Sequence, residues 1–421
     1  MDVLPTKVHL VGIGGIGMSA LAQLLASRGV AISGSDREAS PTTELLAQKG
    51  ISVSIGHGEL PDGVEMIIYS DAIPADNPER VAARLRGIPE RSYFSMLGEI
   101  SRHAKTVAVT GTHGKTTVTG MIARILRDAG AEPTAIVGSI VSDFGSNFLP
   151  GRDDLFVVEA CEYRNHLLEL SPEVLVITNI ELDHTDFFPS LKVLQETMRR
   201  AVEAVPPHGA IITNPQDPHV AVILPAAKAR VIDYTRMAVG ELRLLGEFNR
   251  ENARAALAAA QAAYPALSLE AGVKSLSDFH GSWRRFQYKG ETPNGAIVYD
   301  DYAHHPTAVR KTLIAARERF PGMRIVVAFH PHLHSRTESF LQEFADALDL
   351  ADRAIVAPIY EARTEVRHAV SNATLAAAGK HIESMDSFDD IRNALAAEAA
   401  GTIIITMGAG DIYKVAEQLV G

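Results

Sequence analysis

One segment organises the whole chain: Thr106-Val-Ala-Val-Thr-Gly-Thr-His-Gly-Lys-Thr-Thr117. Residues 107–109 are an apolar run typical of a buried strand, and Gly111 and Gly114 then turn the backbone. Apolar residues recur at helical spacing over residues 115–129, which predicts a helix. A glycine turn between strand and helix presents backbone N–H groups to a phosphate, and the helix dipole favours negative charge there. This segment therefore predicts a phosphate-binding loop.

The side chains of the loop agree with that interpretation. Lys115 would reach the terminal phosphates of a nucleotide, and the Thr116 hydroxyl is placed to hold a magnesium ion. Val109 stands where the strict phosphate-loop pattern has a glycine, so this is a shorter variant of the loop. The alternative is an ordinary glycine turn with a surface lysine. The candidate nucleotide-binding residues are Gly111, Thr112, His113, Gly114, Lys115, Thr116 and Thr117.

Composition narrows the class of protein. The chain has 421 residues, which suits roughly two to four domains, and it is 46% hydrophobic and 22% charged, as in soluble globular proteins. A net charge of −11 argues against a nucleic-acid surface. The single cysteine, Cys161, excludes a disulfide framework and fits a reducing compartment. Without a bilayer-length apolar run or a leading signal pattern, we expect a cytoplasmic protein with no membrane insertion.

Strands and helices alternate along the chain, which predicts an α/β fold with mostly parallel sheets. We expect three domains, at residues 1–102, 103–280 and 281–421. The expected strands are residues 7–11, 31–34, 66–69, 107–109, 155–158, 174–178, 210–213, 229–233, 296–299, 325–329, 354–357 and 402–406.

The first domain carries a second glycine pattern. After the strand at residues 7–11 comes Gly12-Ile-Gly-Gly-Ile-Gly17, then a helix, and then Asp36 about 20 residues further on. This order is typical of dinucleotide-binding domains, in which the glycines let the backbone approach a pyrophosphate. Asp36 could accept a hydrogen bond from a ribose or uracil group. The alternative is a tight turn without a ligand. The candidate substrate-binding residues here are Gly14, Gly15, Ile16, Gly17, Asp36 and Ser70.

Acidic and histidine side chains follow two later strands. Glu159 ends the strand at residues 155–158, and Asp183 and His184 follow the strand at 174–178. Open α/β sheets bind ligands at the carboxyl ends of their strands, so we expect these groups at the site. Glu159 could instead cap a helix, and His184 could be a surface residue.

Taken in order, these motifs resemble those of the Mur ligases, the ATP-dependent amide-forming enzymes of peptidoglycan assembly. The resemblance is carried by Gly111-Thr-His-Gly-Lys-Thr-Thr117, Glu159-Ala-Cys-Glu162, Asn179-Ile-Glu-Leu-Asp-His184, Asn249-Arg-Glu-Asn252, Arg284-Arg-Phe286 and Asp300-Asp-Tyr-Ala-His-His-Pro306. It implies a Rossmann-like N-terminal domain for a UDP-sugar, a central P-loop ATPase domain and a Rossmann-like C-terminal domain that closes on ATP and the amino acid.

The resemblance also implies a reaction and its groups. ATP phosphorylates the UDP-linked carboxylate, an amine attacks the acyl phosphate, and phosphate leaves; ATP and Mg²⁺ are required. The implied catalytic residues are Lys115, Glu159, His184 and Arg336, and the implied metal ligands are Thr116, Glu159 and His184. The implied nucleotide contacts beyond the loop are Asn252, Arg285, Asp301 and His304, and His332 with Arg336 would meet the amino acid or acyl phosphate.

Within the family, the chain resembles the branch that adds L-alanine to UDP-N-acetylmuramate. We expect the chain to be a monomer or a weak homodimer. A sister ligase that adds a recycled murein peptide or another amino acid is the closest rival. An NAD-dependent oxidoreductase would explain only the first glycine pattern, and a non-catalytic relative would not need Lys115 and Glu159. Two further readings are minor: zinc at His330, His332 and His334, and a nucleophilic Cys161.

One departure from the family pattern stands out. The stretch between Asp233 and Leu244 is short where the family carries several more strands. We therefore expect the central domain to lack most of its small β subdomain.

Overall fold

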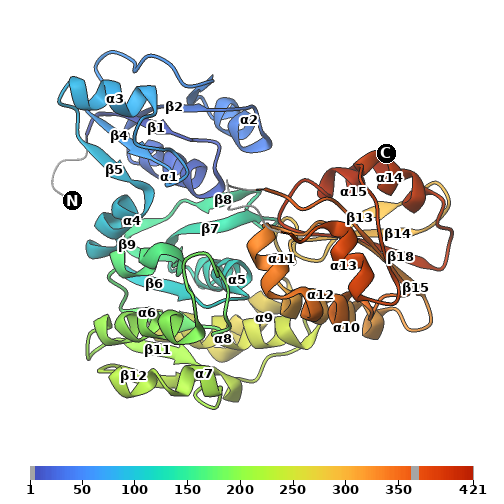
Figure 1. The fold of residues 1–421 in the computed structure, drawn as a ribbon. Helices are drawn as coiled ribbons and strands as arrows, with labels where there is room; N and C mark the ends of the chain where they lie inside the picture. The colour runs from blue at the N-terminus through green and yellow to red at the C-terminus, as the bar shows by residue number, and fades with distance from the viewer. Residues whose placement is uncertain (1–4, 362–368, 421) are drawn as a thin grey trace. The chain divides into compact units, whose positions relative to one another are not determined.

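The computed structural model describes residues 5–361 and 369–420, whose strands form three sheets (Figure 1). The residues fall into two compact units. The first contains the chain up to Ile180 together with Leu194–Glu241 and Asn252–His280. The second contains Glu181–Val193, Leu242–Glu251 and the chain from Gly281 onward.

The first sheet has five parallel strands. Its order is β3 (Ser52–Ile55), β2 (Ala31–Asp36), β1 (Lys7–Val11), β4 (Met66–Tyr69) and β5 (Glu90–Ser92). The helices between these strands are α1 (Ile16–Ser27), α2 (Pro41–Gln48), α3 (Pro78–Leu85) and α4 (Tyr93–Arg102). Local sequence explains where they begin: α2, for example, starts at a proline after Ser40, whose side chain accepts from Thr43 N.

The second sheet has seven strands and belongs to the same compact unit as the first. Its order is β12 (Arg230–Asp233), β11 (Ala210–Thr213), β10 (Val174–Ile177), β6 (Lys105–Thr110), β9 (Arg152–Glu159), β7 (Pro133–Val141) and β8 (Ser146–Leu149). Only β7 and β8 pair antiparallel. The helices of this stretch are α5 (Lys115–Asp128), α6 (Leu191–Ala204), α7 (Pro218–Ala221), α8 (Glu247–Ala263) and α9 (Leu269–Ser277), with short 3₁₀ turns η1 (Tyr163–Glu169), η2 (Leu224–Ala226) and η3 (Tyr234–Arg236).

The third sheet lies in the second unit. Its order is β13 (Gln287–Glu291), β14 (Ile297–Asp301), β18 (Thr402–Met407), β15 (Arg324–Phe329), β16 (Arg353–Val356) and β17 (Ile382–Ser384), with only the β13–β14 pair antiparallel. Its helices are α10 (Pro306–Arg319), α11 (His334–Ser339), α12 (Leu341–Leu348), α13 (Asn372–Ala378), α14 (Phe388–Ala396) and α15 (Tyr413–Val420).

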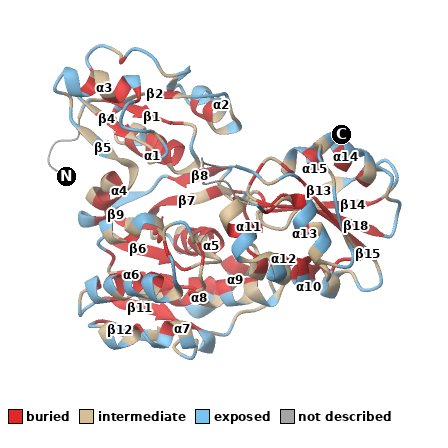
Figure 2. Ribbon diagram, viewed as in Figure 1, coloured by how far each residue is buried: buried red, intermediate tan, exposed pale blue. Residues whose placement is uncertain are grey.

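Both faces of this sheet are covered. Ile325, Val327 and Phe329 of β15 enter one apolar cluster, and the alternate residues Val326 and Ala328 enter another. Side chains of a strand point alternately to the two faces, so helices on each side bury a continuous apolar strand. Figure 2 shows the same pattern in all three sheets, with buried central strands and helices exposed on their outer faces.

The expected α/β fold with mostly parallel sheets is confirmed. Six strands were not expected from the sequence: β3, β5, β7, β8, β13 and β17. All of them except β7 are edge strands, which commonly lack the continuous apolar run of a buried strand. β7 lies between β9 and β8, and its apolar residues are interrupted by a glycine and a serine. The short stretch between Asp233 and Leu244, all of it described, contains η3 and no strand, as expected. Among the described residues, no helix is both long and apolar enough to cross a membrane.

Candidate functional site

Three adjacent strands bring the predicted residues of the first unit together. β6 lies between β10 and β9, and both neighbours run parallel to it. Thr110 pairs with Ile177 of β10, and Val109 pairs with Glu159 of β9. The three strands therefore end side by side. Their carboxyl ends bring together the loop after β6, the acid that ends β9 and the residues after β10.

The two glycines of the loop are required by close contacts. Gly111 has φ of 122° and Gly114 has φ of 88°, which are left-handed conformations that favour glycine. A Cβ at Gly111 would lie 2.2 Å from Thr178 Oγ1, and one at Gly114 would lie 2.4 Å from Asn252 Oδ1. Asn252, expected as an adenine contact, thus lies directly against the loop.

Residues after β10 hold the loop in shape. Asn179 O accepts from Thr112 N at 3.2 Å, and Asn179 Oδ1 accepts from His113 N at 3.0 Å. The Thr178 hydroxyl donates to His113 O at 2.6 Å. Helix α5 then begins at Lys115, with Thr116 and Thr117 buried in its first turn. Hydrogen bonds from Thr178 and Asn179 therefore hold the loop backbone in one conformation, as binding of a phosphate by backbone N–H groups requires.

Lys115 has an acidic partner that the sequence interpretation did not assign. Its Nζ lies 3.0 Å from both carboxylate oxygens of Glu162 and 2.5 Å from Gly111 O. Burial alone would lower the pKa of Lys115, but the charge and hydrogen bond of Glu162, together with the charges of Cys161 and Glu159, raise it. Burial raises the pKa of the neighbouring Cys161 thiol to about 12, so this residue is no thiolate nucleophile.

Glu159 faces the loop from β9. Its Oε2 accepts from the Thr116 hydroxyl at 3.3 Å, and its Oε1 accepts from Gly138 N of β7 at 2.5 Å. A Cβ at Gly138 would lie only 2.6 Å from Glu159 Oε2, so this glycine is required for the approach. The carboxylate therefore accepts from a strand N–H and from a hydroxyl in the first turn of α5. A hydroxyl and a carboxylate side by side are a donor set that suits a hard cation.

The second glycine pattern forms a tight loop before α1. Gly14 N donates to Asp36 Oδ2 at 2.8 Å, so Asp36 stabilises the loop itself. Gly15 occupies the N-cap of α1 and Ile16 is its first residue. A Cβ at Gly17 would lie 2.6 Å from the hydroxyl of Tyr93.

Tyr93 and Ser70 lie beside this glycine loop. Burial raises the pKa of the Tyr93 hydroxyl, and the charges of Glu159 and Cys161 raise it further. Sequence reasoning did not find Tyr93, which has no motif signal. Ser70 Cβ is 3.1 Å from the position a Cβ would take at Gly12.

In the second unit, Asp183 organises the predicted residues. Arg336 donates to Asp183 Oδ1 through Nε at 2.9 Å and Nη2 at 2.7 Å, and through Nη1 to His332 Nδ1 at 2.8 Å. His184, in a left-handed conformation, donates its backbone N–H to the same Asp183 oxygen at 2.7 Å. Burial would raise the pKa of Asp183, but the charge of Arg336 holds it well below its usual range. Burial and Arg336 lower the pKa of His304, which is therefore neutral.

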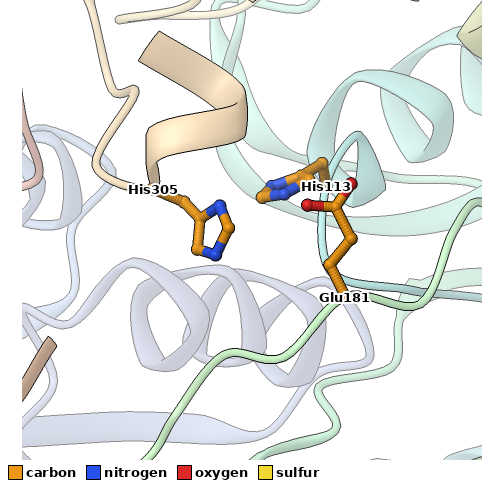
Figure 3. A group of neighbouring side chains, drawn as sticks. All are labelled: His113, Glu181 and His305. Carbon is orange, nitrogen blue, oxygen red and sulfur yellow. The ribbon is translucent and has the colours of Figure 1, made fainter. Parts of the chain in front are cut away.

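A contact between Glu181 and the start of α10 anchors this segment. Glu181 and His305 are drawn as sticks in Figure 3. The Thr307 hydroxyl donates to Glu181 Oε2 at 2.6 Å, and His305 caps α10 by accepting from Thr307 N at 3.3 Å. His305 Nε2 also lies 3.2 Å from Leu182 O. These bonds, which the sequence did not predict, place Asp183 and His184 beside the residues that follow β14.

Asp301 connects the other predicted residues of the second unit. Its carboxylate accepts backbone N–H bonds from Phe286 and Ala303, each at 2.7 Å. Burial raises the pKa of Asp301 to about 6, against the opposing charge of Arg285. The Arg285 guanidinium lies over the Tyr302 ring, 5.0 Å from its centre. Asp301 thus fixes the loops that carry Arg285 and His304.

The alternation of His330, His332 and His334 does not form a metal centre. His334 pairs with Val370 O and Glu361, whereas His332 pairs with Arg336. Within residues 5–361 and 369–420, no group of three potential ligands includes any of these histidines.

Three family models match the chain one after another. The models described as "Mur ligase family, catalytic domain", "Mur ligase middle domain" and "Mur ligase, glutamate ligase domain" match residues 7–105, 109–240 and 284–410. The chain is 37% identical to the UDP-N-acetylmuramate–L-alanine ligase of Agathobacter rectalis and 38% identical to that of Lachnospira eligens, covering 99% of the chain and 98% of each relative.

Solved structures agree with these sequence relatives. The UDP-N-acetylmuramate–alanine ligase of Thermotoga maritima matches with a TM-score of 0.82 and 27% identity over 98% of both chains. A murein peptide ligase of Psychrobacter arcticus shares the fold, with a TM-score of 0.75 and 23% identity over 98% of both chains. The similarity therefore covers all three sheets.

Proposed function

This chain belongs to the Mur ligase family, with its three-domain architecture, and we propose that it joins L-alanine to the carboxylate of UDP-N-acetylmuramate while ATP becomes ADP and phosphate. The proposal is carried by one observation: the phosphate loop, Lys115 and the Thr116–Glu159 pair lie together at the carboxyl ends of β6 and β9. Relatives similar over almost the whole chain bear the name of this activity. The reaction is a cytoplasmic one, in keeping with the single cysteine.

The loop supplies what phosphoryl transfer needs. A carboxylate is a poor electrophile, so its activation requires a leaving group, and phosphate is one. Transfer of a phosphoryl group needs positioning and charge neutralisation more than covalent help. Lys115 and the N–H groups at the start of α5 bind and orient the phosphates of ATP. Asn252, Arg285, Asp301 and His304 are the further nucleotide contacts.

Mg²⁺ is the proposed cofactor. The adjacent oxygens of Thr116 and Glu159 fit a hard cation, and His184 of the second unit is the third proposed ligand. When bound, the ion neutralises charge on the phosphates and on the substrate carboxylate. The chain's own contribution is to hold Glu159 in place through Gly138 N.

The reaction takes place in two steps. A carboxylate oxygen of UDP-N-acetylmuramate attacks the γ-phosphorus, and the bond to ADP breaks. The amine nitrogen of alanine then attacks the acyl carbon, and phosphate leaves with that carboxylate oxygen while the nitrogen loses a proton. Arg336 and His332 are the proposed partners of the amino acid, because a guanidinium suits a carboxylate. Asp183 fixes the plane of the Arg336 group.

Phosphate release measured with UDP-N-acetylmuramate and a panel of amines tests this function. We expect release that requires both substrates and is fastest with L-alanine, compared with glycine, L-serine and a murein tripeptide. Fastest release with the tripeptide would assign the chain to the rival activity. The Lys115→Ala variant should lose turnover and still bind UDP-N-acetylmuramate, and persistent turnover would exclude the assigned role of the loop.

A further inference from the structure

A buried polar cluster outside the proposed site joins the first two sheets. It consists of Ser19 and Gln23 of α1 and Ser146 and Asn147 of β8. The helix α1 and the strand β8 lie side by side (Figure 1). Asn147 and Ser19 are fully buried, and Gln23 and Ser146 are each 4% exposed. Buried polar groups are costly unless they are hydrogen-bonded, so the cluster needs a closed set of bonds.

The bonds of the cluster fix the Asn147 amide in one orientation. Its Nδ2 donates to Ile16 O at 2.5 Å and to Ser19 Oγ at 2.9 Å. Its Oδ1 accepts from Gln23 Nε2 at 3.0 Å, and Gln23 Oε1 accepts from Ser146 Oγ at 3.1 Å. A flipped amide would place its oxygen against the Ile16 carbonyl. Such directional bonds fix position more sharply than apolar contact does.

One end of this connection is the glycine loop of the first sheet. Ile16 is the first residue of α1 and directly follows Gly15, the N-cap residue. Asn147 therefore holds the turn of helix that opens towards the proposed UDP-sugar.

The other end is the acid of the phosphate site. β8 pairs with β7, where Val141 lies opposite Ser146, and β7 in turn pairs with β9. Gly138 of β7 donates its N–H to Glu159. The β7–β8 hairpin therefore contacts the glycine loop on one side and Glu159 on the other, within one compact unit.

We propose that Asn147 is a positioning residue, which sets the distance between the glycine loop of the sugar substrate and the Lys115–Glu159 phosphate site. The inference rests on the proposed function, in which the two loops hold the two reactants of the first step. Reacting atoms need near-contact geometry, and a displacement of about 1 Å costs as much as 100-fold in rate. Asn147 thus acts on turnover without touching either substrate.

The test replaces Asn147 by leucine, which has nearly the same size. Ile16 O keeps a donor in Ser19 Oγ, and Gln23 Nε2 keeps Ser19 O as an acceptor, so the variant leaves few unpaired groups. The matched control is Thr134→Val. Thr134 is also buried and lies on β7, but its hydroxyl bonds to Arg152 O and not to α1.

Four quantities are measured for each protein: the melting temperature, the Kd of UDP-N-acetylmuramate alone, the Kd of a non-hydrolysable ATP analogue alone, and kcat. We expect Asn147→Leu to melt close to Thr134→Val and to bind each ligand within about threefold of the unmodified chain. Its kcat should fall about 10- to 100-fold, whereas the control keeps its kcat.

Two results would overturn the inference. One is a kcat for Asn147→Leu equal to that of the control, and the other is a loss of turnover fully accounted for by weaker binding of one ligand. If Asn147→Leu does not fold, Gln23→Met removes the bond to Asn147 from the helix side and is held to the same criteria. Turnover by the unmodified chain tests the proposed function separately, because the inference depends only on the ratio between variant and unmodified chain.

Discussion

Replacing Glu162 by glutamine removes the charge that faces Lys115 and keeps the size of the side chain. Glu162 is 1% exposed, and both of its oxygens lie 3.0 Å from Lys115 Nζ. Neutralising one partner of a buried ion pair costs about 3–5 kcal/mol, because the other charge loses its compensation. Lys115 keeps its bond to Gly111 O and has an 18% exposed side chain, so we expect a loss of about 3 kcal/mol.

Bound nucleotide should restore part of the free energy of unfolding that the Glu162→Gln variant loses. In the unmodified chain a phosphate has to draw Lys115 away from Glu162, whereas in Glu162→Gln it meets an ammonium without an anionic partner. If the phosphates recover roughly half of the lost free energy, about 1.4 kcal/mol, the Kd of ADP falls about tenfold. The variant should therefore be less stable alone and gain more stability from ADP.

Urea denaturation with and without ADP, together with calorimetric titration of ADP, measures both effects. The matched control is Glu169→Gln, an exposed acid on the same segment that loses the same charge. If Glu162→Gln unfolds at the same urea concentration as Glu169→Gln, or binds ADP more weakly than the unmodified chain, the ion pair does not act as described.

Three further predictions concern other parts of the site. Gly111→Ala should abolish nucleotide binding in a titration, because its Cβ would lie 2.2 Å from a threonine hydroxyl oxygen. The control is Gly130→Ala, where the backbone is also left-handed but the Cβ would enter open space, and this variant should bind normally. Equal binding by the two variants would show that close contact at Gly111 is not what requires a glycine. Asp183→Asn should lower the free energy of unfolding in urea by about 3–5 kcal/mol, because it leaves the charge of Arg336 buried, and a loss under 1 kcal/mol would contradict this. The pKa of Asp301 is raised from 3.8 to about 6, so the folded chain binds this proton more tightly than the unfolded chain. Stability from this group is present below pH 4 and falls by up to about 3 kcal/mol as the pH rises to about 6. Asp301→Asn should lack that part of the pH dependence, and an unchanged pH profile in urea would argue against it.

Sequence predicted the parts of this structure that depend on neighbours along the chain. Local sequence indicates the apolar strand before Gly111, the glycine turn and the helix from Lys115. Most of the central strands are likewise indicated by a continuous run of apolar residues. All of the missed strands except β7 are at sheet edges, such as β5 with its sequence Glu-Arg-Ser. Their structure comes from pairing with a neighbouring strand, which a local pattern does not encode.

The pairings within the site could not be predicted for the same reason. Glu162 is 47 residues from Lys115, and Arg336 is 153 residues from Asp183. Each pair depends on how strands distant in sequence align. Asp36 illustrates the limit, because the sequence predicted its place at the end of the second strand but gave no sign that it would bond to the Gly14 backbone.

The central claim is that ATP activates the muramate carboxylate at the Lys115 loop, and isotope transfer tests it most directly. The chain is incubated with ATP, Mg²⁺, L-alanine and UDP-N-acetylmuramate labelled with ¹⁸O in both carboxylate oxygens. The mass of the released phosphate is then measured by mass spectrometry. The account predicts one ¹⁸O atom in each phosphate, because the acyl phosphate loses a carboxylate oxygen when the amine attacks. Unlabelled phosphate formed alongside the amide product would contradict it.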